Sequence, residues 1–447
     1  MINRIKEDLK INQSFDTGYR YYSINNTEIY IFYIGSLFDQ TNYLLVLDKI
    51  LKINNINELK NNLLANQFFE TNNYDLFINS ILQGKIGIYI NDINILNPYI
   101  ILDLRSYETR SPQEPDTEKV VRGSRDGFVE NIATNISLIR RRVRSKNLIT
   151  KLYQIGIDSK TDVCLCFIND LCDLSLVKEL DYKLSNLKIR ELSMSDKALE
   201  EILIKQGFNP YPLVRYTERP DNVSSHLFQG LIAIIVDTSP SVILLPITVF
   251  DHLQHAEEYR QTPLVGTIIR FIRFFGILLS LFLVPIWYYL VSNNINIPFL
   301  KINDKGNISI FLQLIFAEAG IEFLRMAAIH TPNPLSTAMG LIAGILVGDI
   351  AVKVGLFIPE IVLYVAISQI GSYLTPSYEL SLANKISKFL FLIATHFFKL
   401  TGLIISILIW LIYLANLKSF NKPYLYPLYP FNLKELLKII IRLPKDK

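Results

Sequence analysis

The 447-residue sequence is poor in charge, cysteine and histidine, and each shortage excludes a class of protein. Only 19% of the residues are charged, against about 25% in an average soluble protein, while 50% are hydrophobic. With 45 Lys and Arg against 41 Asp and Glu, the net charge of +4 leaves no basic footprint for a nucleic acid. The abundant Ile, Leu, Phe and Tyr exclude a disordered chain. The composition therefore predicts a membrane protein with a large water-soluble part and no nucleic-acid partner.

The few potential metal ligands and nucleophiles are not arranged for catalysis. Cys164, Cys166 and Cys172 lie in one apolar stretch without a nearby histidine, which predicts buried structural thiols. The sequence has no P-loop, nucleophile elbow, HExxH or dinucleotide-binding glycine motif. His252 and His255 are three residues apart beside carboxylates, a spacing that an amphipathic helix explains more simply than a metal site. We expect no enzymatic activity, no cofactor and no metal.

Residues 1–265 alternate strand-like and helix-like segments, which predicts two small α/β subdomains at 1–104 and 146–265. The expected strands are 29–35, 87–90, 99–104 and 161–168, and the expected helices are 38–53, 73–83, 174–187 and 195–206. The apolar run 230–250 is interrupted by Asp237-Thr238-Ser239-Pro240, a turn signal that favours a β-hairpin over a membrane span.

A polar linker and basic helix, 105–145, joins the two subdomains. The segment becomes helix-permissive from Gly127 and ends in Arg140, Arg141, Arg142 and Arg144. These cations suit the C-terminal end of a helix dipole. They also suit docking on a partner subunit or on an anionic lipid surface, and charge alone leaves both interpretations open.

Residues 266–417 contain long apolar runs and predict an α-helical multi-span membrane domain. The expected spans are 268–291, 334–354, 356–375 and 386–417, with 308–329 as an interfacial or re-entrant helix. Basic residues before the first span and in the tail, 418–447, place both ends in the cytoplasm, which requires an even number of crossings. Five spans with an external tail are the alternative.

Charged residues in the apolar part are candidates for an ion path, because charge inside a membrane is costly and usually functional. The candidate residues are Glu318, Glu322, Arg325, Asp349, Glu360 and Lys399. A ring of carboxylates would attract cations. The alternative is a static bundle in which Glu318 and Glu322 pair with Arg325, Lys353 or Lys399.

Small residues recur every fourth position in one of the expected spans. They are Ser336, Gly340, Gly344 and Gly348. Such a ridge lets helix backbones approach closely in a membrane and predicts a helix-packing surface.

Six tracts in order along the sequence resemble the A subunit of the GerA-type nutrient germinant receptors of endospore-forming bacteria. They are EPDTEKVVRGSRDGFVENIATNISLIRRRVRS (114–145), YPLVRYTERPDNV (211–223), LLPITVF (244–250), EEYR (257–260), TPSYELSLANKISKF (375–389) and NKPYLYPLYP (421–430). The sequence departs from the family pattern at Asn421, where glycine is usual, and residues 1–104 match only loosely.

The resemblance implies a multi-pass subunit of the spore inner membrane, in contact with membrane lipid and with its N-terminal domain in the cytoplasm. It implies a transporter-like B subunit and a lipoprotein C subunit as partners, and a homo-oligomer that passes ions when a germinant binds. The alternative is a non-conducting scaffold or signal-transducing subunit of the same complex, held by a polar subunit interface. The candidate interface residues are Arg110, Glu118, Arg122, Arg125, Glu130, Asn135, Arg140, Arg142, Glu218, Arg219 and Asp221.

Overall fold

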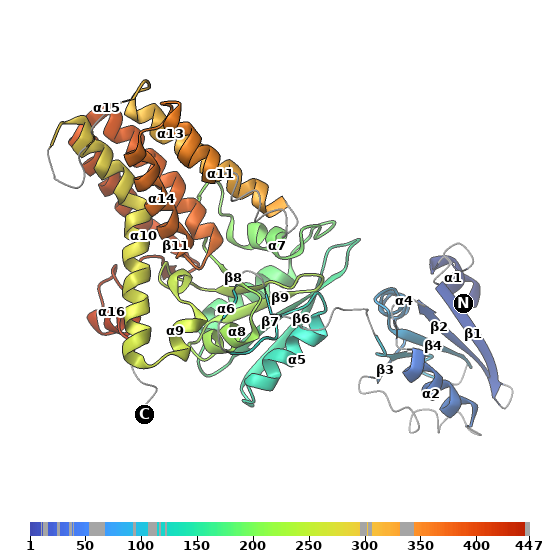
Figure 1. Ribbon diagram of the computed structural model, residues 1–447. Coiled ribbons are helices and arrows are strands. Elements are labelled where there is room, and N and C mark those ends of the chain that lie inside the picture. Colours follow the sequence, from blue (N-terminus) through green and yellow to red (C-terminus); the bar gives the residue numbers. More distant parts are fainter. Residues whose placement is uncertain are drawn as a thin grey trace. The chain divides into compact units, whose positions relative to one another are not determined.

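The computed structural model describes most of the chain. The described residues are 1–9, 11, 17–24, 27–34, 38, 40–52, 68–92, 95–105, 114–115, 118–120, 123–295, 302, 306–330 and 344–442. The chain divides into two compact units, Met1–Ser111 and Pro112–Lys447 (Figure 1). The finer boundaries expected at 104, 145, 265 and 417 stay predictions.

The first unit is an antiparallel sheet covered by helices on both faces. Its strand order is β1 (Thr17–Ile24), β2 (Thr27–Ile34), β4 (Ile86–Asn91), β5 (Tyr99–Leu102) and β3 (Phe68–Thr71). Helix α2 (Gln40–Leu51) packs on one face, and α1 (Ile2–Asp8) and α4 (Tyr74–Leu82) pack on the other. Successive side chains of a strand point to opposite faces, so helices on both sides bury nearly all of β4.

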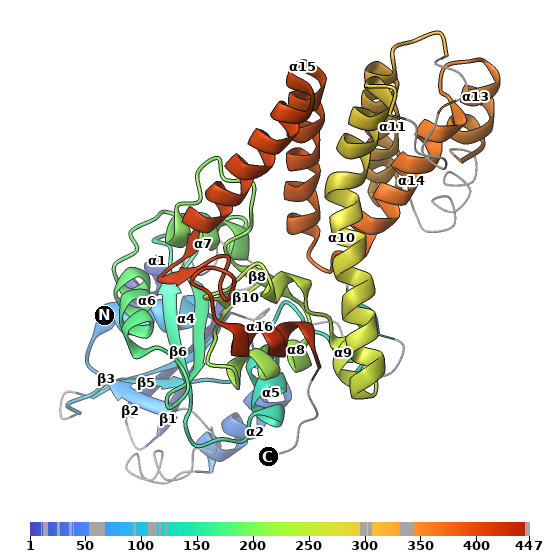
Figure 2. The same cartoon turned by 90° about the vertical axis from the view of Figure 1, so that its left-hand side faces the viewer.

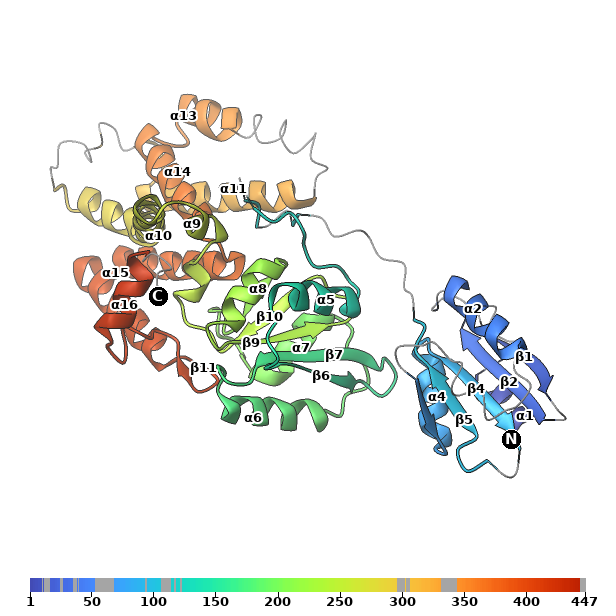
Figure 3. The same cartoon turned by 90° about the horizontal axis from the view of Figure 1, so that it is seen from below.

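The second unit begins with another antiparallel sheet, in the order β6 (Leu148–Ile155), β7 (Thr161–Ile168), β9 (Ile232–Val236), β10 (Val242–Leu245) and β8 (Arg215–Thr217). Helices α5 (Ile132–Arg142) and α8 (Pro220–Leu227) cover one face, and α6 (Leu174–Ser185) and α7 (Ser195–Ile204) cover the other (Figure 3).

The expected β-hairpin is confirmed, since β9 and β10 are antiparallel neighbours with Ile235 opposite Val242. Cys164 and Cys166 lie in the core on β7, where burial raises the pKa of each thiol to about 12. The alternation of strands and helices is also as expected. All described strand pairs are nevertheless antiparallel, so the soluble part is strictly an α+β and not an α/β arrangement. The prediction differed because the alternation of strands and helices does not determine strand direction.

A helical bundle follows the sheet of the second unit. It contains α9 (Ala256–Arg260), α10 (Pro263–Ser292), α11 (Ile310–His330), a π-helical turn (Gly344–Ile350), α13 (Ala351–Lys353), α14 (Pro359–Tyr373) and α15 (Tyr378–Asn416). Among the described helices, α10 and α15 are long and apolar enough to cross a membrane. The four-span arrangement stays a prediction.

The expected span 386–417 is not one straight helix, because α15 turns back at Lys399, where φ is 52°. In a continuous helix Phe391 and Trp410 would lie about 28 Å apart. Their ring centroids are 5.8 Å apart instead, and the two halves of α15 run side by side (Figure 2). Both ends of this hairpin reach the sheet, since Leu380 and Leu414 join the core that contains β9 and β10.

The segment expected as a basic tail is partly built into the second unit. A two-stranded ribbon, β11 (Lys418–Ser419) and β12 (Lys422–Pro423), is followed by α16 (Leu433–Ile440). Ser419 and Tyr424 are fully buried, and Tyr424 lies in the sheet core with Leu414. The chain therefore returns from the helical bundle to complete the core of the sheet.

Candidate functional site

The carboxylates of α11 bind lysines of α15 inside the helical bundle. Glu318 Oε1 accepts a hydrogen bond from Lys388 Nζ at 2.6 Å, and these side chains are only 4% and 2% exposed. Glu322 Oε2 accepts from Lys385 Nζ at 2.7 Å. The carboxylates are one helical turn apart and so are the lysines, so both pairs form between the same two helix faces.

Arg325 and Ser368 extend this row of polar side chains. Arg325 pairs with Glu322 one turn away on α11, and its guanidinium lies 4.8 Å from the centre of the Tyr378 ring. On α14, the hydroxyl of Ser368 accepts a second hydrogen bond from Lys388 at 3.2 Å. Three helices therefore meet at a cluster of two carboxylates and three cations, which we call the α11–α15 charge cluster (Glu318, Glu322, Arg325, Lys385 and Lys388).

The ion pairs of the charge cluster hold α11 and α15 together. A buried ion is tolerated only while its counter-ion stays in contact, so separating α11 from α15 would leave uncompensated charge. While the pairs are closed, the carboxylates are occupied by ammonium and guanidinium groups. They can attract a mobile cation only after those groups move away.

The other expected ion-path residues lie elsewhere. Asp349 and Lys353 pair with each other at 2.6 Å, with side chains 60% and 70% exposed. Glu360 is half-buried in the first turn of α14, and Lys399 is exposed at the turn of the α15 hairpin. The structure thus brings together Glu318, Glu322 and Arg325 but not Asp349, Glu360 or Lys399.

Lys385 and Lys388, the counter-ions of the cluster, were not among the candidate residues predicted from the sequence. Lys388 is the third residue of the expected span 386–417, and Lys385 directly precedes that span. Lys385 and Lys388 are three residues apart and Glu318 and Glu322 are four apart, so each pair shares one helix face, a signal that was available in the sequence.

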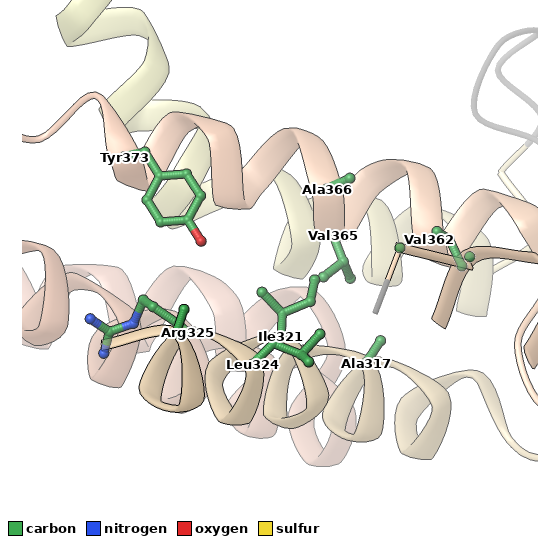
Figure 4. A pocket seen from close by; sticks show the side chains of 11 residues that line it. Ala317, Ile321, Leu324, Arg325, Val362, Val365, Ala366 and Tyr373 are labelled. Carbon is green, nitrogen blue, oxygen red and sulfur yellow. The ribbon is translucent and has the colours of Figure 1, made fainter. Parts of the chain in front are cut away.

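The described half of the small-residue ridge faces a cavity. Gly344 and Gly348 line a space of about 390 Å³ between α11, α14 and the π-helical turn. Figure 4 shows Ala317, Ile321 and Arg325 on one side of it and Val365 and Tyr373 on the other. A Cβ atom added at either glycine would meet nothing within 4 Å. Ser336 and Gly340 lie outside the described residues, so the ridge as a helix-packing surface stays a prediction.

The polar tracts 114–145 and 211–223 meet around the fully buried guanidinium of Arg219. This group donates to Asp221 Oδ2 at 2.8 Å and to the carbonyl oxygens of Glu118 and Ser124 at 3.0 and 3.1 Å. Arg260 of α9 also donates to Asp221, at 2.7 Å. Burial alone raises the pKa of Asp221, but the bonds from the two arginines outweigh it and hold that pKa below its usual value.

Other members of the expected subunit interface also bind within the chain. Glu118 accepts from Thr217 at 2.5 Å, and Arg142 donates to Asp126 at 2.6 Å. The buried amide of Asn135 accepts from the backbone N–H of Val129 at 2.9 Å and donates to its carbonyl at 2.5 Å.

The remaining candidates of this interface have more contact with solvent. Arg125, Glu130 and Arg140 are exposed, and Glu218 is half-buried. Arg110 and Arg122 lie outside the described residues. A subunit interface formed by this set stays a prediction.

Comparisons with known proteins bear out the resemblance seen in the tracts. A family model described as Bacillus/Clostridium GerA spore germination protein matches residues 3–447. Stage V sporulation protein AF of Bacillus subtilis (strain 168) is 45% identical over 452 residues, which cover 98% of this chain and 91% of that protein. Spore germination protein A1 of the same organism is 34% identical over 383 residues, covering 82% of this chain and 77% of that protein.

The chain is also similar to a solved structure. The crystal structure of the N-terminal domain of the A subunit of the Bacillus megaterium spore germinant receptor GerK3 is 26% identical, covers 55% of this chain and 92% of that chain, and gives a TM-score of 0.24. Because the family model spans nearly the whole sequence, this chain belongs to the GerA family of spore germination proteins.

Proposed function

We propose that the chain is a multi-pass membrane subunit of a spore germination receptor in the spore inner membrane, with its N-terminal domain in the cytoplasm. It acts there with a transporter-like B subunit and a lipoprotein C subunit. It forms a homo-oligomer whose α11 helices line an ion path that opens when a germinant binds. The observation that carries this proposal is the α11–α15 charge cluster, in which lysines hold the buried carboxylate of Glu318 and the partly buried carboxylate of Glu322 between apolar helices.

The course of the chain supports several crossings. Helix α10 begins at the end of the bundle next to the sheet and runs to the opposite end. Helix α11 begins at that opposite end, since the ring centres of Phe311 and Tyr288 are 6.0 Å apart. Helix α14 begins at that opposite end too, since Gln313 accepts from the backbone N–H of Ile358 at 3.0 Å. It runs back along α10 to Gly276.

We therefore assign four crossings, to α10, α11, the expected span 334–354 and α14. We assign a re-entrant hairpin to α15. This keeps the expected even number of crossings but exchanges the roles first expected for 308–329 and 386–417. The apolar hairpin tip at His396 reaches Tyr288, near the far end of α10, where the hydroxyl and Nδ1 are 2.7 Å apart.

In this arrangement the charge cluster is the closed gate of the path. Opening requires the lysines of α15 to leave Glu318 and Glu322, so that the carboxylates of neighbouring copies face a common space. The cavity beside Gly344 and Gly348 leaves room for a helix of a neighbouring copy to approach their backbone closely.

A second candidate function is a scaffold or signal-transducing subunit that conducts nothing. It is favoured by the closure of both carboxylate pairs within one chain, which leaves no unpaired charge for ions at the cluster. On this alternative, the exposed Arg125, Glu130 and Arg140 contact the neighbouring subunits.

Ion flux from liposomes containing the purified chain, with its partner subunits and germinant supplied, separates the two functions. Changing Glu318→Gln together with Lys388→Met removes the carboxylate without leaving its buried lysine unpaired, and it lowers the flux at unchanged protein level if α11 lines the path. Asp349→Asn, which alters an exposed pair outside the cluster, is the matched control. Equal flux from all three proteins overturns conduction through α11 and leaves the scaffold function.

A further inference from the structure

Residues 428–442 display a row of apolar side chains on the surface of the second unit. In α16, Leu433 and Leu437 are 56% and 44% exposed, and just before it Tyr429 and Phe431 are 60% and 67% exposed. No residue of α16 is buried. A helix with an apolar face normally turns that face toward a core. This one leaves its leucines uncovered within the part of the chain that the structure describes.

Polar bonds to the first turns of α10 hold α16 in place. Arg270 donates to the carbonyl oxygens of Lys438 and Ile439 at 3.1 and 2.9 Å. The backbone N–H of Arg442 donates to Thr267 at 3.1 Å. Figure 1 shows α16 beside the end of α10 that begins the bundle. The helix is therefore fixed through its C-terminal end.

The surface of α10 becomes apolar at this same level. Leu264, Ile268, Phe271 and Phe275 lie on one face of α10 and are 72%, 49%, 54% and 63% exposed. On the proposed function, this face meets lipid. The turns that bind α16 are thus the turns at which the chain enters the membrane.

The charges of α16 suit the surface of an anionic bilayer. Lys434 and Lys438 are exposed, one turn apart, next to the leucines. Glu435 is half-buried and pairs with Lys438 at 2.8 Å. In the sequence, Lys445 and Lys447 follow. Short helices with Leu and aromatic residues on one face and lysines on the other bind in the plane of a bilayer interface.

We propose that α16 lies in the membrane surface beside α10, with Leu433 and Leu437 at the acyl-chain boundary and Lys434 and Lys438 on anionic lipid headgroups. Tyr429 takes the interfacial position common for aromatic residues. The inference rests on the proposed membrane function and adds a lipid contact to it. It commits to a bilayer as the occupant of this face, and a protein partner would overturn it.

Fluorescence quenching by nitroxide-labelled lipids tests the contact in the full-length chain. Single cysteines labelled with an environment-sensitive dye are introduced in a Cys172→Ser background, in which the remaining Cys164 and Cys166 are buried. The protein is placed in nanodiscs of equal parts phosphatidylcholine and phosphatidylglycerol, or of phosphatidylcholine alone. The test position is Leu437→Cys, with Leu433→Cys as a second position on the same face.

Two further positions make the outcome specific. Leu174→Cys on α6 is the matched control, because Leu174 is 46% exposed and Leu437 is 44% exposed. Leu408→Cys on α15, where Leu408 is 53% exposed, reports on the proposed membrane placement itself. We expect the labels at 408 and 437 to be quenched and the label at 174 to stay bright.

The lysines are tested in the same discs. Changing Lys434→Gln and Lys438→Gln together lowers the ratio of quenched to unquenched label at 437 by roughly tenfold or more in phosphatidylglycerol discs and leaves the label at 408 unchanged. Quenching at 437 that is equal in both lipids and insensitive to the lysines overturns the assignment to anionic headgroups.

The remaining outcomes separate this inference from the proposed function. An unquenched label at 408 refutes the membrane placement of α15. Quenching at 408 without quenching at 437 and 433 refutes only the inference on α16. A blue-shifted label at 437 that lipid does not quench indicates a protein contact on this face and overturns the bilayer as its occupant.

Discussion

Replacing Lys388 by methionine tests whether the charge cluster holds the helical bundle together. The change removes the ammonium group from Glu318 but keeps a long apolar side chain in the same space. The carboxylate is then buried without its counter-ion, because the two side chains are 2% and 4% exposed. Breaking one side of such a buried pair costs about 3–5 kcal/mol.

The expected shift in melting temperature follows from the size of the unit. For the second unit, Pro112–Lys447, an unfolding entropy of about 2.1 cal/mol/K per residue gives roughly 0.7 kcal/mol/K. The lost stability then lowers Tm by roughly 4–7 °C. Thermal unfolding of the detergent-purified chain, followed by tryptophan fluorescence, measures this shift.

Two further variants show whether burial is the cause. Lys353→Met breaks a pair with the same 2.6 Å separation whose side chains are 70% and 60% exposed, and we expect no measurable shift. Lys388→Met with Glu318→Gln removes both charges and recovers most of the loss. Equal shifts for Lys388→Met and Lys353→Met, or a double variant no more stable than Lys388→Met, would refute the reasoning.

Three other predictions concern the second unit. Asn135→Ala removes the side-chain partners of the N–H and carbonyl groups of Val129 and lowers the free energy of unfolding by about 2–4 kcal/mol in denaturant titration. An unchanged denaturation midpoint would contradict a stabilising role of these two hydrogen bonds. Burial lowers the pKa of His252 to about 3. Below pH 6.5 the unfolded state therefore binds a proton that the folded state does not, and the free energy of unfolding falls toward pH 3. In thermal melts across that range, Tm should depend less on pH for His252→Asn. Gly371→Ala, whose new methyl group meets the backbone of α10, lowers Tm, while Gly344→Ala, with open space at its Cβ, leaves it unchanged; equal Tm values argue against this packing.

Local signals in the sequence were sufficient for the hairpin of β9 and β10. The turn residues Asp237 to Pro240 divide the apolar run into two short segments rich in β-branched residues. The structure places Thr238 in this turn with a positive φ of 69°. The identity of the strands was therefore readable, because turn chemistry is encoded within a few residues.

The turn of α15 was not readable in the same way. Its apolar run has no Pro or Gly at the turn itself, and Lys399 adopts a left-handed conformation that the residue type does not favour. The hairpin depends on contacts of Phe391 and Trp410 with each other and with Phe282 of α10. Such long-range packing leaves no periodic signal, although His396, Lys399 and Thr401 did interrupt the run.

The charge cluster was half predicted for a related reason. The stripe of Glu318, Glu322 and Arg325 is a property of one helix and was visible in its spacing. The choice between a ring of carboxylates and static pairs depended on which helix lies opposite, which the sequence of α11 does not contain. The structure supplies Lys385 and Lys388 as the partners in a single chain.

The burial of Tyr424 beside β10 has a consequence for the order of synthesis. At about 5–20 residues per second, the roughly 180 residues between β10 and Tyr424 take about 10–40 s to translate. During that time the ribosome synthesises the helices of the bundle, while the apolar surface of the sheet that later contacts Leu414 and Tyr424 is exposed to water. On the proposed function, the helices then insert into the bilayer before the core of the sheet is complete. A nascent chain delayed at this stage exposes an aggregation-prone apolar surface until Leu414 and Tyr424 arrive.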